Sequence, residues 1–89
     1  MEGNLVHQVQ PVYPLLARQA RIQGSVVLRA VIDRDGNIKN LQVLSGHPML
    51  VEAAMDAVRQ WRYRPYVLNE QPIEVETQIT VNFTLAGGG

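Results

Sequence analysis

The sequence predicts an α+β domain with the element order α-β-β-α-β, in which two helices pack on one face of a three-stranded antiparallel sheet of strand order 2-1-3. Three observations lead to this fold class. Apolar and polar residues alternate without a break over 73–85, apolar residues recur at helical spacing over 50–61, and Asp35-Gly36 separates two apolar runs. A period of two is typical of a half-buried strand and a period of 3.6 of an amphipathic helix, while Asp-Gly is a strong hairpin signal.

Composition limits the chain to one small domain without thiol chemistry. Its 89 residues are 46% hydrophobic, which suffices for a modest core, and they include no cysteine. A chain without cysteine forms neither disulfides nor cysteine-ligated zinc sites. No run approaches the roughly 20 apolar residues of a membrane span, and no apolar segment near Met1 resembles a signal peptide.

The chain is expected to divide into an extended lead-in (1–12), a folded domain (13–85) and a flexible tail (86–89). The lead-in shows no usable periodicity, and the tail consists mainly of glycine. The first helix of the domain is expected over Leu15–Gln23, directly after a proline that suits a first helical turn. Gly24 is expected to end that helix.

The next two elements are expected to form a β-hairpin. Ser25–Asp33 and Ile38–Leu44 are the two strands, and the Asp-Gly dipeptide lies in the turn between them. The apolar residues of the second strand change parity between Ile38 and Leu41. A change of parity indicates an extra residue, so we expect a bulge near Lys39-Asn40.

The second helix has the clearest pattern in the sequence. Its apolar stripe has the spacing i, i+3, i+4, i+7, i+8, i+11 and consists of Leu50, Ala53, Ala54, Ala57, Val58 and Trp61. Pro48 suits the first turn. Pro65 disfavours helical geometry at the residue before it, so we expect the helix to end near Arg62 or Tyr63.

The last strand is expected to lie at an edge of the sheet. Ile73, Val75 and every second residue up to Leu85 share one face, and polar residues share the other. Strand order 2-1-3 leaves the third strand with unpaired N–H and C=O groups along one side. A long edge strand without proline is a template for another strand, and addition of a strand is a standard way to bind an extended peptide.

Three constellations suggest chemistry, and each has a simpler structural interpretation. Asp33-Arg34-Asp35-Gly36 resembles the start of a calcium loop, but its glycine falls at position 4, whereas an EF-hand needs glycine at position 6 and glutamate at position 12, where this chain has Leu44. Ser45 and His47 lack a readable orienting carboxylate, and His47 is better explained as a helix-start residue. Glu74 and Glu76 share the solvated face of the last strand. We therefore predict no catalytic residue, no metal site and no cofactor.

The segment 58–66, VRQWRYRPY, interleaves aromatic and basic residues as some nucleic-acid binders do. The chain as a whole has 8 basic and 8 acidic residues and no net charge, whereas nucleic-acid affinity comes mainly from a basic excess. Arg62 and Arg64 are better explained by the favourable interaction of cations with a helix C-terminus. We predict no nucleic-acid partner.

An ordered series of motifs resembles the C-terminal domain of TonB-family energy transducers. The series covers residues 10–85 and consists of Gln10-Pro11-Val12-Tyr13-Pro14, Ala17, Gly24, Asp35-Gly36, Ser45-Gly46, Leu50, Ala53-Ala54, Ala57, Trp61-Arg62-Tyr63-Arg64-Pro65 and the closing strand to Leu85. In the family a glycine often stands in the turn before the last strand, where this chain has Asn69-Glu70-Gln71-Pro72. Asn69 is the residue expected at positive φ there, because asparagine tolerates it better than glutamate.

The resemblance implies a periplasmic domain tethered to the inner membrane by an N-terminal helix outside this chain. Its partners would be outer-membrane TonB-dependent receptors, gripped through their TonB-box peptide, and an ExbB/ExbD-type motor complex reached through the membrane anchor. Force derived from the proton gradient would then open receptors to siderophores or cobalamin.

The partner-binding residues implied for this chain are Gln10, Pro11 and Val12 before the Tyr-Pro motif, and Thr77, Gln78, Ile79, Thr80, Val81, Asn82 and Phe83 on the last strand. The motif residues Tyr13, Pro14, Gly24, Asp35, Gly36, Trp61, Arg62, Tyr63 and Pro65 are expected to be structural. Two alternatives stay open. One is a homodimer paired through the third strand, and the other is a peptide-interaction module of a sensor or envelope protein.

Overall fold

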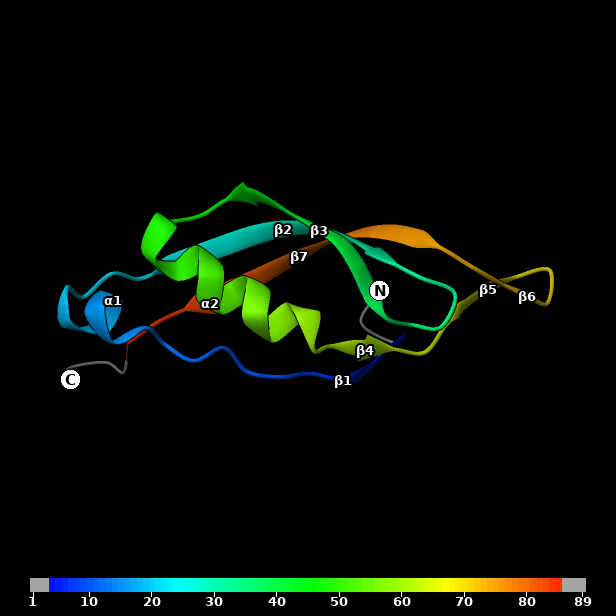
Figure 1. Cartoon of the computed structure of the whole chain (residues 1–89), viewed down its shortest axis with the longest axis horizontal. Coiled ribbons are helices and arrows are strands. Elements are labelled where there is room, and N and C mark those ends of the chain that lie inside the picture. Colours follow the sequence, from blue (N-terminus) through cyan, green and yellow to red (C-terminus); the bar gives the residue numbers. More distant parts are fainter. Residues whose placement is uncertain (1–3, 86–89) are drawn as a thin grey trace.

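The computed structural model describes residues 4–85; the expected tail at 86–89 and the first three residues of the lead-in lie outside this range. Seven strands and two helices follow one another along these residues (Figure 1). In chain order they are β1 (Leu5–His7), α1 (Leu15–Gln19), β2 (Gly24–Ile32), β3 (Ile38–Ser45), α2 (Pro48–Arg59), β4 (Arg62–Tyr63), β5 (Tyr66–Leu68), β6 (Gln71–Ile73) and β7 (Val75–Phe83).

The central sheet has the predicted topology. Its strand order is β3-β2-β7 and both pairings are antiparallel, which confirms the order 2-1-3 expected from the sequence. β2 and β7 pair residue by residue from Gly24↔Phe83 to Ile32↔Val75 without a register shift. One face of this pair is buried. Its side chains are those of Val26, Leu28, Ala30, Ile32, Ile79, Val81 and Phe83.

The helices cover one face of the sheet. α2 contacts β2, β3 and α1, and Figure 1 shows it crossing β2 and β7 with α1 at one end of the molecule. Leu50, Ala54 and Val58 bring the apolar stripe of α2 into the core, and Ala17 does the same for α1.

β3 departs from a regular strand at two points. Arg29 pairs with Gln42 while Val31 pairs with Lys39, so one extra residue of β3 is accommodated at the position predicted for a bulge. Asn40 has φ of 52° there. A second register shift, between Val27 and Leu28 of β2, was not predicted.

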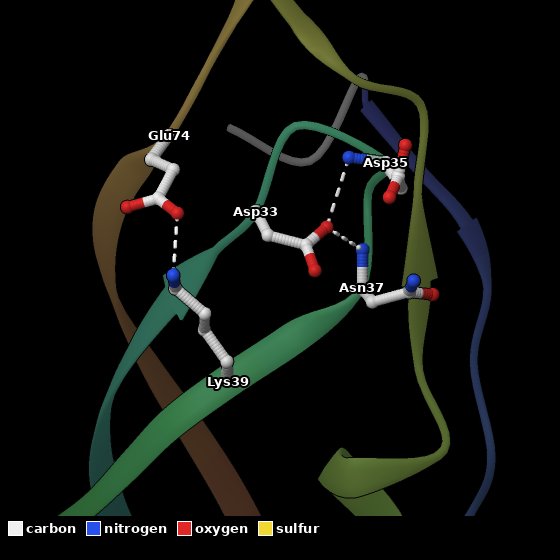
Figure 2. A network of polar contacts seen from close by, with 5 residues as sticks. All are labelled: Asp33, Asp35, Asn37, Lys39 and Glu74. Carbon is white, nitrogen blue, oxygen red and sulfur yellow. Dashed lines mark hydrogen bonds and ion pairs between the residues drawn. The ribbon is translucent and has the colours of Figure 1, made fainter.

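The hairpin turn is closed by Asp33, as Figure 2 shows. The Asp33 carboxylate accepts hydrogen bonds from the backbone N–H groups of Asp35 and Asn37, both at 2.9 Å. An aspartate that caps its own turn in this way stabilises it locally. Lys39 and Glu74 form an ion pair beside the turn at 2.5 Å; both side chains are more than 40% exposed, so the pair adds little to stability.

The first helix is shorter than predicted, and Gly24 does not end it. α1 stops at Gln19, and Arg21 adopts a left-handed φ of 57°. The Arg21 N–H donates to the Arg18 carbonyl and the Ile22 N–H to the Ala17 carbonyl, which is the Schellman pattern usually built on glycine. Gly24 is instead the first residue of β2, with φ of 144°.

The second helix also ends earlier than predicted. α2 stops at Arg59, and Arg62-Tyr63 form the short strand β4. The expectation that the helix would reach Arg62 or Tyr63 was wrong, because the backbone there pairs with β1 instead. At the other end His47 caps the helix, since its Nδ1 accepts from the Met49 N–H at 3.1 Å; this confirms its expected role at the helix start.

The last strand is interrupted, in contrast to the continuous 73–85 expected. β5 and β6 form a separate hairpin. Glu74 belongs to no strand and separates β6 from β7, which begins at Val75. Asn69 and Glu70 connect the hairpin with φ of 51° and 67°. Asn69 has the positive φ predicted for it, and the prediction missed Glu70. A two-residue hairpin of type I′ requires positive φ at both central positions.

Replacing Glu70 by glycine is expected to stabilise the domain by about 0.5–1 kcal/mol. A left-handed conformation costs an L-residue about 1–2 kcal/mol, and the greater entropy of glycine in the unfolded chain offsets part of the gain. Urea unfolding followed by circular dichroism measures the change. Asn69→Gly is the matched control. Its free energy of unfolding should rise less, because asparagine tolerates the left-handed region. An unaltered or lower midpoint for Glu70→Gly would contradict this account of the turn.

Candidate functional site: the free edge of β7

The two outer strands of the central sheet differ as templates for a further strand. β3 carries two register shifts, and irregular edges of this kind discourage pairing with another chain. β7 has nine consecutive residues in unbroken register with β2, contains no proline and has no positive φ within it. The edge of β7 that faces away from β2 is therefore the regular, unblunted edge of the sheet.

A groove follows this edge. It comprises two adjoining hollows of about 210 and 220 Å³, which share Gln8, Trp61 and Thr80 as lining residues. We call it the edge groove. Its lining consists of Leu5, Gln8, Gln10, Pro11, Trp61, Tyr63, Thr77, Gln78, Ile79, Thr80, Val81 and Asn82. The groove thus lies between β7 on one side and the N-terminal segment, residues 4–11, on the other.

The N-terminal segment is held by β4. Leu5 pairs with Tyr63 and His7 with Arg62, and Asn4 and Arg64 exchange two hydrogen bonds. β4 is itself held by the β2–β3 turn, because the Tyr63 N–H donates to the Gly36 carbonyl at 2.9 Å. Figure 1 shows the segment running along the lower side of the molecule beneath α2.

Trp61 lines both hollows of the edge groove. It follows the end of α2, its side chain is only 7% exposed, and it belongs to the core cluster. Its indole N–H donates to the Val9 carbonyl at 2.9 Å. Tyrosine and tryptophan need a partner for their polar atom when they are buried, so this bond explains both the burial of Trp61 and the course of the segment above it.

The lining of the edge groove carries no charge near neutral pH. Its one titratable side chain is Tyr63, and burial raises the pKa of that phenol above its ordinary value of 10.0, with a further contribution from Tyr66. The remaining lining residues are apolar, amide or hydroxyl side chains. A ligand in this groove would meet only uncharged groups of the protein.

Most of the predicted partner-binding residues line the edge groove, and two of them, Val12 and Phe83, do not. Gln10 and Pro11 line the groove opposite residues 77–82. Val12 lies apart, 82% exposed, at a separate hollow against α2. Phe83 is buried and meets the Tyr13 ring edge-on at 5.4 Å.

Four lining residues were missed by the sequence analysis as part of a site: Leu5, Gln8, Trp61 and Tyr63. The two aromatic residues had been assigned to structure alone. One signal in the sequence pointed to Trp61: a buried indole N–H needs a hydrogen-bond acceptor. This requirement does not indicate which carbonyl is the acceptor.

The other constellations have structural roles. Asp33 and Asp35 belong to the hairpin turn, and His47 caps α2. Nη1 of Arg62 donates to the carbonyl of Arg59, the last residue of α2, at 3.2 Å and to that of Trp61, just beyond the helix, at 2.8 Å. Within residues 4–85, no three His, Asp or Glu side chains are grouped so that they could hold a metal ion.

The fold and the edge groove are typical of one class of protein, the small α+β domains that bind an extended chain along a sheet edge. Among the helices formed by residues 4–85, none has the length and apolar content needed to cross a membrane. Comparison with known proteins then identifies the family. The profile of the family "Gram-negative bacterial TonB protein C-terminal" matches residues 9–85.

The chain belongs to this family, and the resemblance seen in the ordered motifs is confirmed. It is 37% identical over 82 residues to Protein TonB of Vibrio cholerae serotype O1, covering 90% of this chain and 34% of that protein. The solution NMR structure of the Pseudomonas aeruginosa TonB CTD superposes with a TM-score of 0.80 at 26% identity, covering 96% of this chain and 88% of that one.

A second solved structure agrees. The TonB2 protein of Vibrio anguillarum matches with a TM-score of 0.69 at 32% identity, over 91% of this chain and 79% of that one. Members of the family are energy transducers and not enzymes, and the domain is a periplasmic one. The chain spans about a third of the length of the curated relatives it matches.

Proposed function

We propose that this domain binds the TonB-box peptide of TonB-dependent outer-membrane receptors as an added strand on the free edge of β7. The observation that carries the proposal is the edge groove, which runs beside a strand of nine residues in unbroken register. Strand addition takes its affinity from main-chain hydrogen bonds. The family supports the identity of the partner.

The same geometry suits the transmission of force. A receptor peptide paired along β7 would be pulled nearly parallel to both strands, so that several backbone hydrogen bonds would share the load at once. In the full-length protein the pull would come from an inner-membrane helix coupled to an ExbB/ExbD-type complex. The peptide would transmit this force to the receptor, which would then admit a siderophore or cobalamin.

Titration with capped receptor TonB-box peptides, followed by backbone amide NMR shifts, tests the proposal. We expect shifts at residues 77–82 of β7 and at 8–11 of the N-terminal segment. Residues 40–44 of β3 serve as the internal control, because that edge is broken by register shifts. Shifts confined to β3 or to the open face of the sheet, or no shifts at all, would count against the proposal.

Binding of a capped box peptide without charged side chains should be insensitive to salt and to pH between about 5 and 9. The groove lining contains no charged side chain, so there is little for salt to screen. Tyr63 has a raised pKa, and its phenol therefore stays neutral throughout this window and ionises only above it. Isothermal titration calorimetry at low and high salt measures the effect. A tenfold loss of affinity on raising the salt would contradict an uncharged site.

A homodimer paired through two copies of β7 is the second candidate, favoured by the same unblunted edge. Such a dimer would occupy the edge and compete with the peptide. Analytical ultracentrifugation over a wide concentration range tests it, and the expected result is a dimer that dissociates when the box peptide is added. A sedimentation coefficient that stays that of a monomer at high concentration would exclude this candidate.

A further inference from the structure

One hydrogen bond to a side chain holds the part of the N-terminal segment that follows β1. The pairing of β1 with β4 ends at His7, and the next hydrogen-bonded side chain in the sequence is Tyr13, whose phenol donates to the Ile22 carbonyl. Between them, the Val9 carbonyl accepts from the indole of Trp61. Within residues 4–85 and outside the strand pairings, this is the only hydrogen bond that reaches residues 8–12.

The Val9 bond also sets which side chains face the groove. Successive side chains of an extended chain point in opposite directions. Val9 packs against the core, while its neighbours Gln8 and Gln10 line the groove. Holding the Val9 backbone therefore holds the two amide side chains opposite β7.

We propose that Trp61 is a positioning residue of the strand-addition site, which keeps Gln8 and Gln10 in place as its second wall. The inference rests on the proposed function. A peptide strand that pairs with β7 has a second backbone edge turned toward the N-terminal segment. Glutamine amides offer both donors and acceptors, so Gln8 and Gln10 would satisfy groups on that second edge.

The sharpest test removes the indole N–H and keeps the ring. In the full 89-residue chain, Trp61 is replaced by 3-benzothienylalanine, in which sulfur takes the place of the N–H group. Binding of a capped TonB-box peptide is then measured by calorimetry and its dissociation by stopped flow. Loss of one hydrogen bond from the site predicts an affinity about fivefold to tenfold lower, through faster dissociation. Trp61→Phe is the recombinant counterpart.

An unchanged affinity would overturn the inference. A higher affinity would also overturn the inference, because it would show that the N-terminal segment competes with the peptide for the edge of β7 and does not help to bind it. Circular dichroism and the NMR spectrum of β2 provide the control for folding. In the analogue, amide exchange at residues 8–10 should accelerate while β2 stays protected.

A double-mutant cycle separates positioning from a general loss of stability. Gln8→Ala is expected to weaken peptide binding about threefold in the native background and to have no further effect when the Trp61 N–H is absent. Residues that act through one another give non-additive effects of this kind. Additive losses would show that Trp61 does not act through the segment. If the native chain binds no box peptide, the proposed function fails together with this inference; if it binds and the variants bind equally, only this inference fails.

Discussion

Trp61→Ala is expected to lower the free energy of unfolding by about 3–5 kcal/mol, the range observed for removal of a large buried aromatic side chain. The ring belongs to the core cluster between the end of α2 and β7. Its removal leaves a cavity beneath the sheet edge and also takes the donor away from the Val9 carbonyl. Both effects act at one place, where the helix, the N-terminal segment and β7 meet.

Urea unfolding followed by far-ultraviolet circular dichroism measures this loss, because the variant has no tryptophan fluorescence. Trp61→Phe is the matched control. It keeps an aromatic ring in the cavity and should lose about 1–2 kcal/mol, from the hydrogen bond and the smaller ring. A Trp61→Ala midpoint equal to that of the native chain would show that the indole does not support the core.

Gly36→Ala is expected to cost about 3–4 kcal/mol, although it adds a single methyl group. Gly36 is buried and has φ of 88°, a conformation that costs an L-residue about 1–2 kcal/mol. A Cβ atom at this position would come within 1.9 Å of the Tyr63 carbonyl oxygen. That oxygen belongs to the backbone of β4, so the clash is relieved only by moving β4 away from the turn, at a cost typical of overpacking.

The matched control for Gly36→Ala is Gly24→Ala. Gly24 also has positive φ, but a Cβ atom there would meet nothing within 4 Å. The control therefore measures backbone strain alone, and the difference between the two variants isolates the contact with Tyr63. Equal losses for both variants would refute that contact. In Gly36→Ala we further expect faster amide exchange in β1, because β1 pairs with β4.

Local patterns predicted the central sheet well. The alternation of β7 assigned its faces, the Asp-Gly turn joined β2 to β3, and the change of parity after Ile38 located the bulge. These features depend on residues close in the sequence, where side-chain period and turn chemistry decide the conformation. The helix ends were predicted less well, because Arg21 takes a left-handed position that sequence rules assign to glycine.

What the sequence by itself determined is the fold class, the strand order, the buried face and the existence of a free edge at β7. Only the tertiary structure decided what lies opposite that edge. β1 and β4 are too short and irregular to carry a period, and Trp61 and Val9 are 52 residues apart in the chain. The hydrogen bond between Trp61 and Val9 forms because a buried indole N–H needs an acceptor. Which carbonyl accepts it depends on the packing of the folded chain and cannot be read from the neighbouring sequence.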